Sequence, residues 1–240
     1  NLKVYSAKNL KPDSPTEVGF FNNDFNDASL ANLTGADLAA ALFGEGNYLL
    51  GQGEKDADLR IENGALRLIG DNGKAPTDGR KANNRSQFLL ASNDQVSQGV
   101  VIECNYMFNE GSQNAFNFAS KAIVPSGYID AGDVWITGLW TNAGYRTSLR
   151  CTATKNSWTN PGIVNSNDTT YCSTGISYGL RIVVSPGEGI KLYAKRSTSD
   201  SYALLADLTT DIINQSGNTL YADCLDNNVR LILQCNCDVT

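Results

Sequence analysis

YGLRIVVSPGEGIKLYAK, residues 178–195, is the stretch that decides the fold. Apolar and polar residues alternate on both sides of the turn sequence SPGEG, which is typical of two antiparallel β-strands joined by a tight turn. A second hairpin is predicted at 57–69, where the dipeptide Asn63-Gly64 tolerates the positive φ angles of a hairpin turn. The sequence therefore predicts an all-β, antiparallel protein.

The same alternation recurs along most of the chain. Further strands are predicted at 86–91, 99–108, 133–141, 145–152, 202–208 and 228–235. Only residues 30–43, rich in Ala and Leu, favour a helix, so at most one or two short helices are expected. Because no linker, repeat or low-complexity block interrupts the 240 residues, we expect a single domain of residues 1–240.

The hairpin at 178–195, together with the following DSYALLAD (200–207), resembles strands of the concanavalin A-like and laminin G-like sandwiches. The opening FFNNDF (20–25) is similar to the N-terminal edge strand of such domains. The resemblance implies a two-sheet antiparallel β-sandwich of the jelly-roll kind. It also implies a family bias toward binding or cutting polysaccharides, although a fold alone does not fix a function.

Composition excludes two classes of protein and favours an extracellular one. With 19 basic and 25 acidic residues the net charge is −6, which excludes a generic nucleic-acid binder. No apolar run is long enough for a membrane-spanning helix. The chain starts at Asn1 rather than Met, as a secreted protein would after removal of a leader. Four glycosylation sequons point the same way, at Asn32, Asn84, Asn167 and Asn214.

The six cysteines are expected to form disulfides. A chain without His, and with the close spacing Cys235-Asn236-Cys237, does not match the usual zinc-ligand patterns. Our expected pairs are Cys151 with Cys172, Cys224 with Cys235 or Cys237, and Cys104 with the remaining partner. No cofactor is expected, although the turns at 71–73 and 130–133 carry Asp oxygens that could bind calcium.

Catalytic signals are weak. Glycoside hydrolysis needs two carboxylates, and the Glu-x-Asp-x-x-Glu run of the resembling glucanases is absent, which leaves Glu103 as a weak candidate. Without His the usual Ser and Cys triads are excluded. A uronate lyase would use Tyr193 as its base, with Arg146 neutralising the uronate.

Candidate ligand-binding residues come from strand alternation. Cations and polar residues oppose apolar neighbours in several strands, and on one sheet they would form a surface suited to an anionic sugar, because Arg holds carboxylates bidentately. The alternative is that these residues have no binding role, because antiparallel sheets commonly keep one face exposed to solvent. The candidates are Arg146, Arg150, Arg181, Lys191, Tyr193 and Gln87, with Trp158 in the loop 155–167 as a stacking residue.

Two further tryptophans lie in the predicted strand 133–141. Trp135 and Trp140 have opposite parity, so they lie on opposite faces unless a bulge at Gly138 breaks the alternation.

Three functions remain open. The leading interpretation is a secreted protein that binds a glycan, with acidic polysaccharide as its more specific form. The first alternative is a polysaccharide-degrading enzyme on the same fold, either a uronate lyase or a glycoside hydrolase. The second is a self-associating structural subunit of an extracellular fibre or coat, in which residues 1–18 pair with a neighbouring subunit rather than with their own sheet.

Overall fold

The hairpin of residues 178–195 forms as expected. In the computed structural model, β11 (Ser177–Ser185) and β12 (Gly189–Lys195) pair antiparallel, from Gly179 opposite Lys195 to Ser185 opposite Gly189. The structure describes residues 1–7, 19–50, 59–69, 86–107, 109, 114–121, 134–142, 146–150, 171, 173, 175–185, 189–197, 199–208, 230–235 and 238–239.

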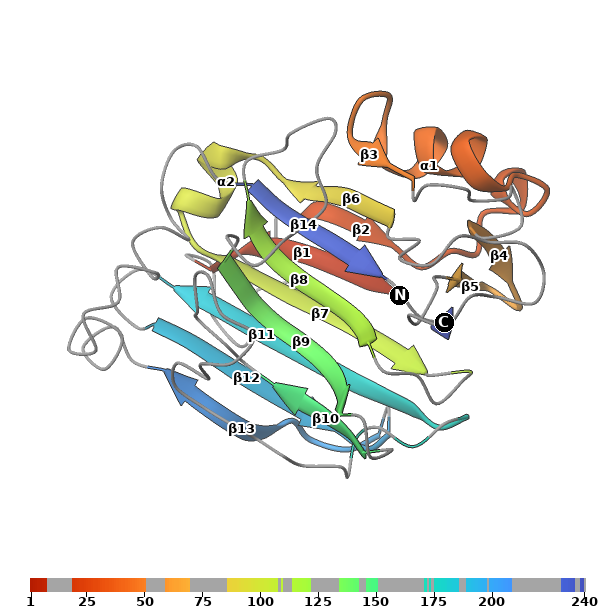
Figure 1. Ribbon diagram of the computed structural model, residues 1–240. Helices are drawn as coiled ribbons and strands as arrows, with labels where there is room; N and C mark the ends of the chain where they lie inside the picture. The colour runs from red at the N-terminus through yellow and green to blue at the C-terminus, as the bar shows by residue number, and fades with distance from the viewer. Residues whose placement is uncertain are drawn as a thin grey trace.

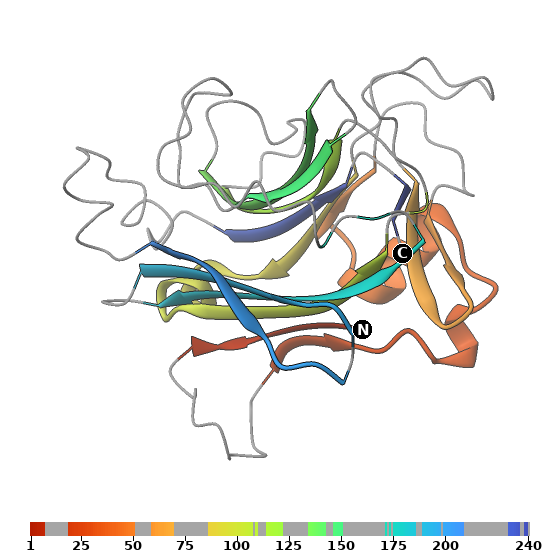
Figure 2. The same cartoon turned by 90° about the horizontal axis from the view of Figure 1, so that it is seen from below.

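Two six-stranded antiparallel sheets lie one over the other (Figures 1 and 2). The first sheet has the order β13–β12–β11–β7–β1–β2. Its other strands are β1 (Leu2–Ser6), β2 (Gly19–Asn23), β7 (Val100–Met107) and β13 (Ala203–Leu208). The all-β sandwich expected from the sequence is confirmed.

The second sheet has the order β10–β9–β8–β14–β6–β3. Its strands are β3 (Tyr48–Leu49), β6 (Ser86–Ala91), β8 (Asn114–Lys121), β9 (Val134–Asn142), β10 (Arg146–Arg150) and β14 (Arg230–Cys235). A small third sheet, β15–β5–β4, consists of β4 (Leu59–Glu62), β5 (Ala65–Ile69) and β15 (Asp238–Val239). Its hairpin lies where 57–69 was predicted.

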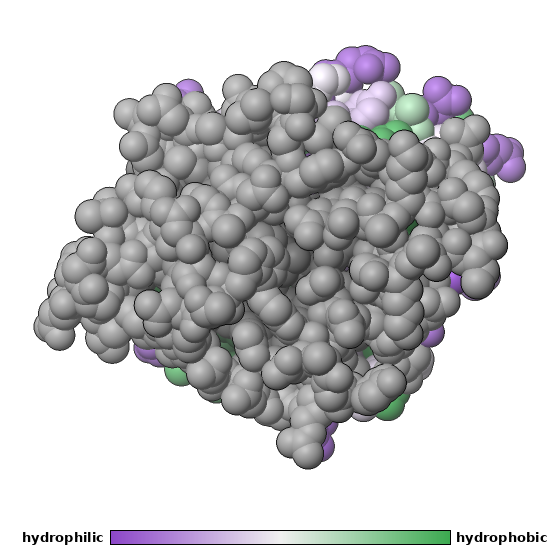
Figure 3. Space-filling model, viewed as in Figure 1, coloured by the Kyte–Doolittle hydropathy of each residue, from purple (hydrophilic) through white to green (hydrophobic). Residues whose placement is uncertain are grey.

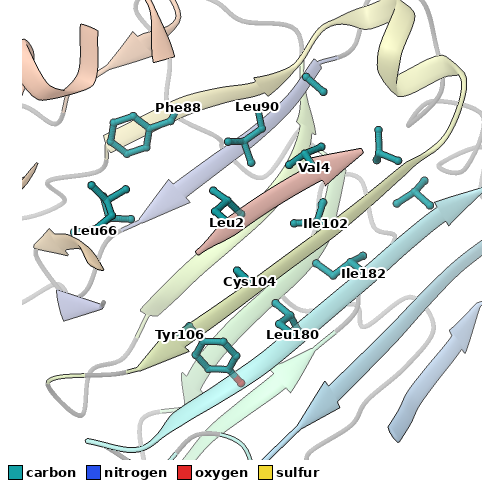
Figure 4. Packing of buried hydrophobic residues seen from close by; sticks show 14 of the residues in the cluster. Leu2, Val4, Leu66, Phe88, Leu90, Ile102, Cys104, Tyr106, Leu180 and Ile182 are labelled. Carbon is teal, nitrogen blue, oxygen red and sulfur yellow. The ribbon is translucent and has the colours of Figure 1, made fainter. Parts of the chain in front are cut away.

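The core fills the space between the two large sheets (Figure 4). Alternate residues of the first sheet, among them Ile102, Leu180 and Ile182, have no exposed surface and face Phe88 and Leu90 of the second sheet. Burial of this kind stabilises the fold by about 1.5–3 kcal/mol per large side chain. The intervening residues of each strand therefore lie on the outer faces, where a binding site has to be sought.

A short helix closes one end of the sandwich. α1 (Gly35–Phe43), preceded by the 3-10 turn η2 (Ala28–Leu30), lies within the segment where a helix was predicted. Phe43 stacks on Phe21 of β2 and Phe88 of β6, with ring centroids 5.4 Å and 4.6 Å away. At this corner the described surface is mostly hydrophilic (Figure 3).

A second helix, α2 (Asn93–Ser97), was not predicted. It begins with a capping box, in which the Ser92 side chain accepts from the backbone of Gln95 and the Gln95 side chain accepts from the backbone of Ser92. The Ser-x-x-Gln spacing was present in the sequence. No helix of the described residues is long and apolar enough to cross a bilayer.

The N-terminal segment corrects one expectation. Residues 2–6 form β1, which pairs with β2 on one side and β7 on the other side of its own sheet. This strand is therefore not free to pair with a neighbouring subunit, as the fibre hypothesis required of residues 1–18. Residues 8–18 lie outside the described part of the chain.

Cys104 corrects a second expectation. Its side chain is a free thiol, 7% exposed, on the inner face of β7 (Figure 4). The side chains of the other five cysteines lie outside the described set, so the predicted pairs among them stay predictions. Alternation alone would have placed Cys104 inside the core, since Ile102 and Tyr106 share its parity.

We expect Cys104 to resist alkylation in the folded protein. Burial raises the pKa of its thiol to about 12, so almost no thiolate is present at pH 8 to react with iodoacetamide. The peptide that carries Cys104 should take up the label only after denaturation, and without a reductant. Mass spectrometry of the digested protein checks this, and a Cys104 peptide that labels only after reduction would show that the residue forms a disulfide.

The turn of the β4–β5 hairpin leads to a second prediction, which concerns the stability of the fold. Asn63 and Gly64 have φ angles of 54° and 73°, and a Cβ on Gly64 would lie 2.6 Å from Oδ1 of Asn26. We expect Gly64→Ala to lower the free energy of unfolding by about 1–2 kcal/mol from the backbone alone, plus the cost of moving Asn26. Gly46→Ala is the matched control, because φ is 77° there and a Cβ would meet nothing within 4 Å. Equal losses in urea denaturation would show that the contact with Asn26 costs nothing.

Candidate functional site

The outer face of the first sheet carries an ion pair. Glu103 of β7 lies opposite Arg181 of β11, and its Oε1 accepts hydrogen bonds from Nε of Arg181 and, at 2.7 Å, from the hydroxyl of Tyr5. The Glu103 and Arg181 side chains are 21% and 35% exposed. Both charges are therefore engaged with partners of the same sheet.

Tyr202 contacts Arg181 of this ion pair and also Lys195. The guanidinium of Arg181 lies 4.4 Å from its ring centroid and the ammonium of Lys195 4.8 Å, which are cation–π distances. Burial, followed by the negative charge of Glu103, raises the pKa of Tyr202 to about 12. Beside it, Tyr193 packs against the apolar cluster of Tyr5, Ala7, Val101 and Val183. These contacts make the face a stabilising layer rather than an open site.

The second sheet carries a polar row. Strand register places Arg150 opposite Gly138, Gly138 opposite Asn117, Asn117 opposite Gln234, and Gln234 opposite Gln87. Neighbouring residues of a strand lie on opposite faces, and Phe88 belongs to the core, so the row of Gln87 lies on the outer face. At about 4.8 Å between strands, the row spans about 19 Å. Gln87 is 6% exposed, which shows that the face is covered at β6.

Two tryptophans of β9, Trp135 and Trp140, lie near this row. Trp140 is opposite Ser148 of β10 and Asn114 of β8, one register step from Gly138 and on the same face. The pairs Thr137–Phe118 and Trp135–Ala119 show one additional residue in β9, so Trp135 returns to the face of Trp140. The irregularities of register flank Gly138 rather than coincide with it. The two tryptophans therefore share a face, which is the outcome expected if a bulge breaks the alternation, although the bulge does not lie at Gly138 itself.

All the charges in the strands of the second sheet have one sign. Its six strands contain four basic residues and no Asp or Glu, in a chain with 25 acidic residues. The basic residues are Lys121, Arg146, Arg150 and Arg230. Arg146 and Arg150 have the parity of the polar row, and Lys121 lies directly opposite Arg230 in the same face. By register, these four basic positions therefore share one face with the amide-bearing residues of the polar row, and we call it the cationic face.

A pocket of about 380 Å³ lies elsewhere, between the β4–β5 hairpin and the ends of β7 and β11. Its lining residues are Asn1, Glu62, Asn63, Ala65, Arg67, Asn105, Tyr106, Met107, Asn109 and Ser177. The Glu62 carboxylate lies 2.7 Å from Nη1 of Arg67 and 3.2 Å from Nη2 of Arg60. The hydrogen bond from Arg67 is the main reason that the pKa of Glu62 is lowered.

The fold of this chain is similar to the folds of solved structures. One from work on endo-acting O-glycanases, which prominent members of the human gut microbiota express to initiate mucin breakdown, aligns with a TM-score of 0.52 and 10% identity. The alignment covers 90% of this chain and 84% of that one. The fold is a concanavalin A-like jelly roll. No known protein family and no curated protein matches the sequence.

Two further structures align with this jelly roll more loosely. A variant of the Emp46p carbohydrate recognition domain has a TM-score of 0.47 and 12% identity over 91% of this chain and 94% of that one. SCLam, a non-specific endo-β-1,3(4)-glucanase from family GH16, has a TM-score of 0.42 and 12% identity over 90% of this chain and 78% of that one.

The jelly roll divides the predicted site residues between its two sheets. Arg146, Arg150 and Gln87 lie in the second sheet, whereas Glu103, Arg181, Lys191 and Tyr193 lie in the first. They therefore do not form one surface, which corrects the one-sheet supposition. The outer faces of the two sheets point away from each other, so Tyr193 and Arg146 do not meet as base and uronate-binding residue.

Other predicted positions are described only in part. Asn32 is exposed in the turn after η2, as a glycosylated residue would be. Trp158, the sequons Asn84, Asn167 and Asn214, and the calcium candidates at 71–73 and 130–133 lie outside the described residues. Within the described part of the chain, no group of three or more His, Cys, Asp or Glu could hold a metal ion.

Sequence reasoning missed half of the cationic face. β8 was not predicted, so Asn117 and Lys121 were never considered, although Phe116 and Phe118 alternate with polar residues in NAFNFASK. Gln234 and Arg230 lie in a strand that was predicted, but only the pairing of β14 with both β8 and β6 aligns them with Asn117 and Gln87. Pairing between distant strands has no local signal in a sequence.

Proposed function

We propose that this jelly roll binds an acidic polysaccharide on the outer face of its second sheet. The observation that carries the proposal is the charge pattern of the six strands, which hold four basic residues and no carboxylate. Arginine binds a carboxylate or sulfate bidentately, and none of these six strands carries an acidic residue that would repel such groups.

The residues beside these cations favour a sugar as the ligand over a simple inorganic anion. Asn117 and Gln234 bring amides, which both donate and accept hydrogen bonds and so suit hydroxyl groups. Trp140 and Trp135 share the face, and indole offers a flat apolar surface on which a sugar ring stacks. The O-glycanase with the same fold acts on glycans, which is an association of fold and supports the class only.

The pair formed by Lys121 and Arg230 also supports an anionic ligand. Two cations directly opposite each other in neighbouring strands destabilise a sheet. An acidic group bound between them would remove that cost. Asp94 lies on α2, which contacts β14, the strand that carries Arg230, so an acidic residue is already present near that end of the sheet. Arg146 and Arg150 lie on β10 at the far edge, and they are therefore the clearer residues to substitute.

A binding function is favoured over hydrolysis at this face. Cleavage of a glycosidic bond uses a pair of carboxyl groups about 5–9 Å apart, and these six strands contain none. A lyase needs a base on the same face as the arginines, and Tyr193 belongs to the other sheet. A degrading enzyme on this fold remains the alternative that product analysis decides.

Affinity electrophoresis tests the proposal. The protein should migrate more slowly in native gels that contain polygalacturonate than in gels that contain a neutral β-glucan, and added NaCl should weaken the retardation because it screens the charges. Arg146→Gln with Arg150→Gln should weaken binding at least about tenfold, the usual scale of two charge-assisted hydrogen bonds. Incubation with the same polymers should release no fragments detectable by mass spectrometry.

Lys3→Gln with Arg196→Gln is the matched control, since it removes the same charge from two exposed positions outside the second sheet, Lys3 of β1 and Arg196 just after β12. Equal losses in both double variants would show that net charge, not this face, governs binding. Equal retardation by both polymers would overturn the acidic class, and no retardation by either would overturn glycan binding. Unsaturated products would establish a lyase and saturated ones a hydrolase.

The proposal includes secretion. The sequons motivate it, and Asn32 is exposed in a turn where a glycan could be attached. Expression in a eukaryotic secretory host should give a protein whose mass falls on enzymatic deglycosylation. An unmodified Asn32 in the secreted protein would count against this part of the proposal.

A further inference from the structure

The pocket beside the β4–β5 hairpin is a second place where the chain gathers polar groups. One wall is the hairpin, with its turn residue Asn63, and the other is formed by Asn105 and Met107 of β7 and Ser177 of β11. None of these elements belongs to the second sheet. At about 380 Å³ the pocket falls within the size range of small-molecule sites.

The two charged side chains that line the pocket, Glu62 and Arg67, are paired with each other. Glu62 and Arg67 both line it, and they are joined by a 2.7 Å ion pair with side chains 41% and 24% exposed. The lowered pKa of Glu62 keeps the carboxylate ionised through the neutral range. A charged ligand would have to compete with one partner for the other, so an uncharged ligand fits better.

The remaining lining can bind hydroxyl groups and an apolar surface together. Asn63 and Ser177 are exposed and Asn105 is half-buried, and each of these side chains both donates and accepts hydrogen bonds. Ala65 and Met107, both half-buried, add apolar surface. A sugar ring combines apolar C–H faces with a rim of hydroxyl groups that donate and accept.

We infer that this pocket binds one neutral sugar residue, separately from the polysaccharide face of the second sheet. The two sites differ in the charged residues of their strands, since the strands of the face carry four basic residues and no acidic one, whereas Glu62 and Arg67 of the pocket form an ion pair. The inference goes beyond the proposed function and does not depend on it. The pocket would then bind a branching or chain-terminal neutral sugar, while the face of the second sheet binds the acidic backbone of the polysaccharide.

Saturation-transfer NMR with methyl glycosides of glucose, galactose and mannose and with N-acetylglucosamine tests the inference. At least one of these sugars should receive saturation from the protein, with an affinity in the millimolar range. Asn105→Leu keeps the side chain's size and removes its amide, so it should weaken that binding at least about tenfold, as expected when a hydrogen-bonding partner is lost. Ala65→Phe, which fills the pocket, should abolish it.

Asn22→Leu is the matched control, because Asn22 is an exposed asparagine of β2 outside the pocket lining. Thermal unfolding of each variant shows that the chain is folded. If no sugar of the panel binds, or if the control and Asn105→Leu lose binding equally, the inference is wrong. Because the Arg146 and Arg150 double variant leaves the pocket intact, its behaviour on polygalacturonate tests the other site separately.

Discussion

Replacement of Phe88 by alanine is expected to lower the free energy of unfolding by about 3–5 kcal/mol. Phe88 has no exposed surface, and its ring stacks on Phe43 of α1, which in turn stacks on Phe21 of β2. The three rings join the second sheet, the helix and the first sheet (Figure 4 shows Phe88 within the core). The loss combines burial of a large apolar side chain with a cavity that the surrounding strands cannot fill.

Urea denaturation measures this loss as a shift of the midpoint at constant slope. A domain is stable by only about 5–15 kcal/mol, so Phe88→Leu is the milder variant if Phe88→Ala does not fold. Leu89→Ala is the control on the same strand, where the side chain is only half-buried and faces the other way. A loss below about 1 kcal/mol for Phe88→Ala, or a larger one for Leu89→Ala, would contradict the packing described.

Glu103→Ala is expected to cost about 1–3 kcal/mol, the range for leaving polar groups without their partner. The change deprives Arg181 of its carboxylate and the 5%-exposed Tyr5 of the acceptor for its hydroxyl. Complete burial would raise the cost further, but the Arg181 side chain is 35% exposed and water compensates part of the loss. The loss should shrink in high salt.

A double-mutant cycle of Glu103→Ala with Tyr5→Phe separates the hydrogen bond from the ion pair. We expect the two losses to be less than additive, because each variant removes the same hydrogen bond. Full additivity would show that the Tyr5 hydroxyl and the Glu103 carboxylate do not interact. Glycan retention should be unchanged in both variants, since neither residue belongs to the second sheet.

Much of the fold could be predicted because each strand carries its own signal. The segments 86–91 and 189–195 begin and end where they were expected, and the Asn63-Gly64 turn does so as well. β1, β3, β8 and β15 were missed. β1 reads LKVYS, and four of its five residues are buried, including Tyr5 on the outer face, so burial does not alternate along the strand.

The site was harder to predict than the fold because it depends on which strands are neighbours. Arg150 and Gln87 are both predicted ligand-binding residues, and both lie in the same row, but no local pattern separates them from Arg181 and Tyr193. That separation follows from the sheet order, which is set by packing between segments far apart in the chain. Glu103 and Arg181, both candidate site residues, form an ion pair with each other, and their role in a site stays a prediction.

The position of β14 has a consequence for how the chain reaches this fold. β14 lies between β8 and β6, although its residues 230–235 follow all the other strands of that sheet in the chain. Until they arrive, β6 and β8 each lack a neighbour, and each presents unpaired backbone groups of the kind that recruit other chains. The second sheet therefore cannot be completed before residues 230–235 are available for pairing. Chains truncated before residue 230 are expected to aggregate, because the centre of this sheet then lacks a strand.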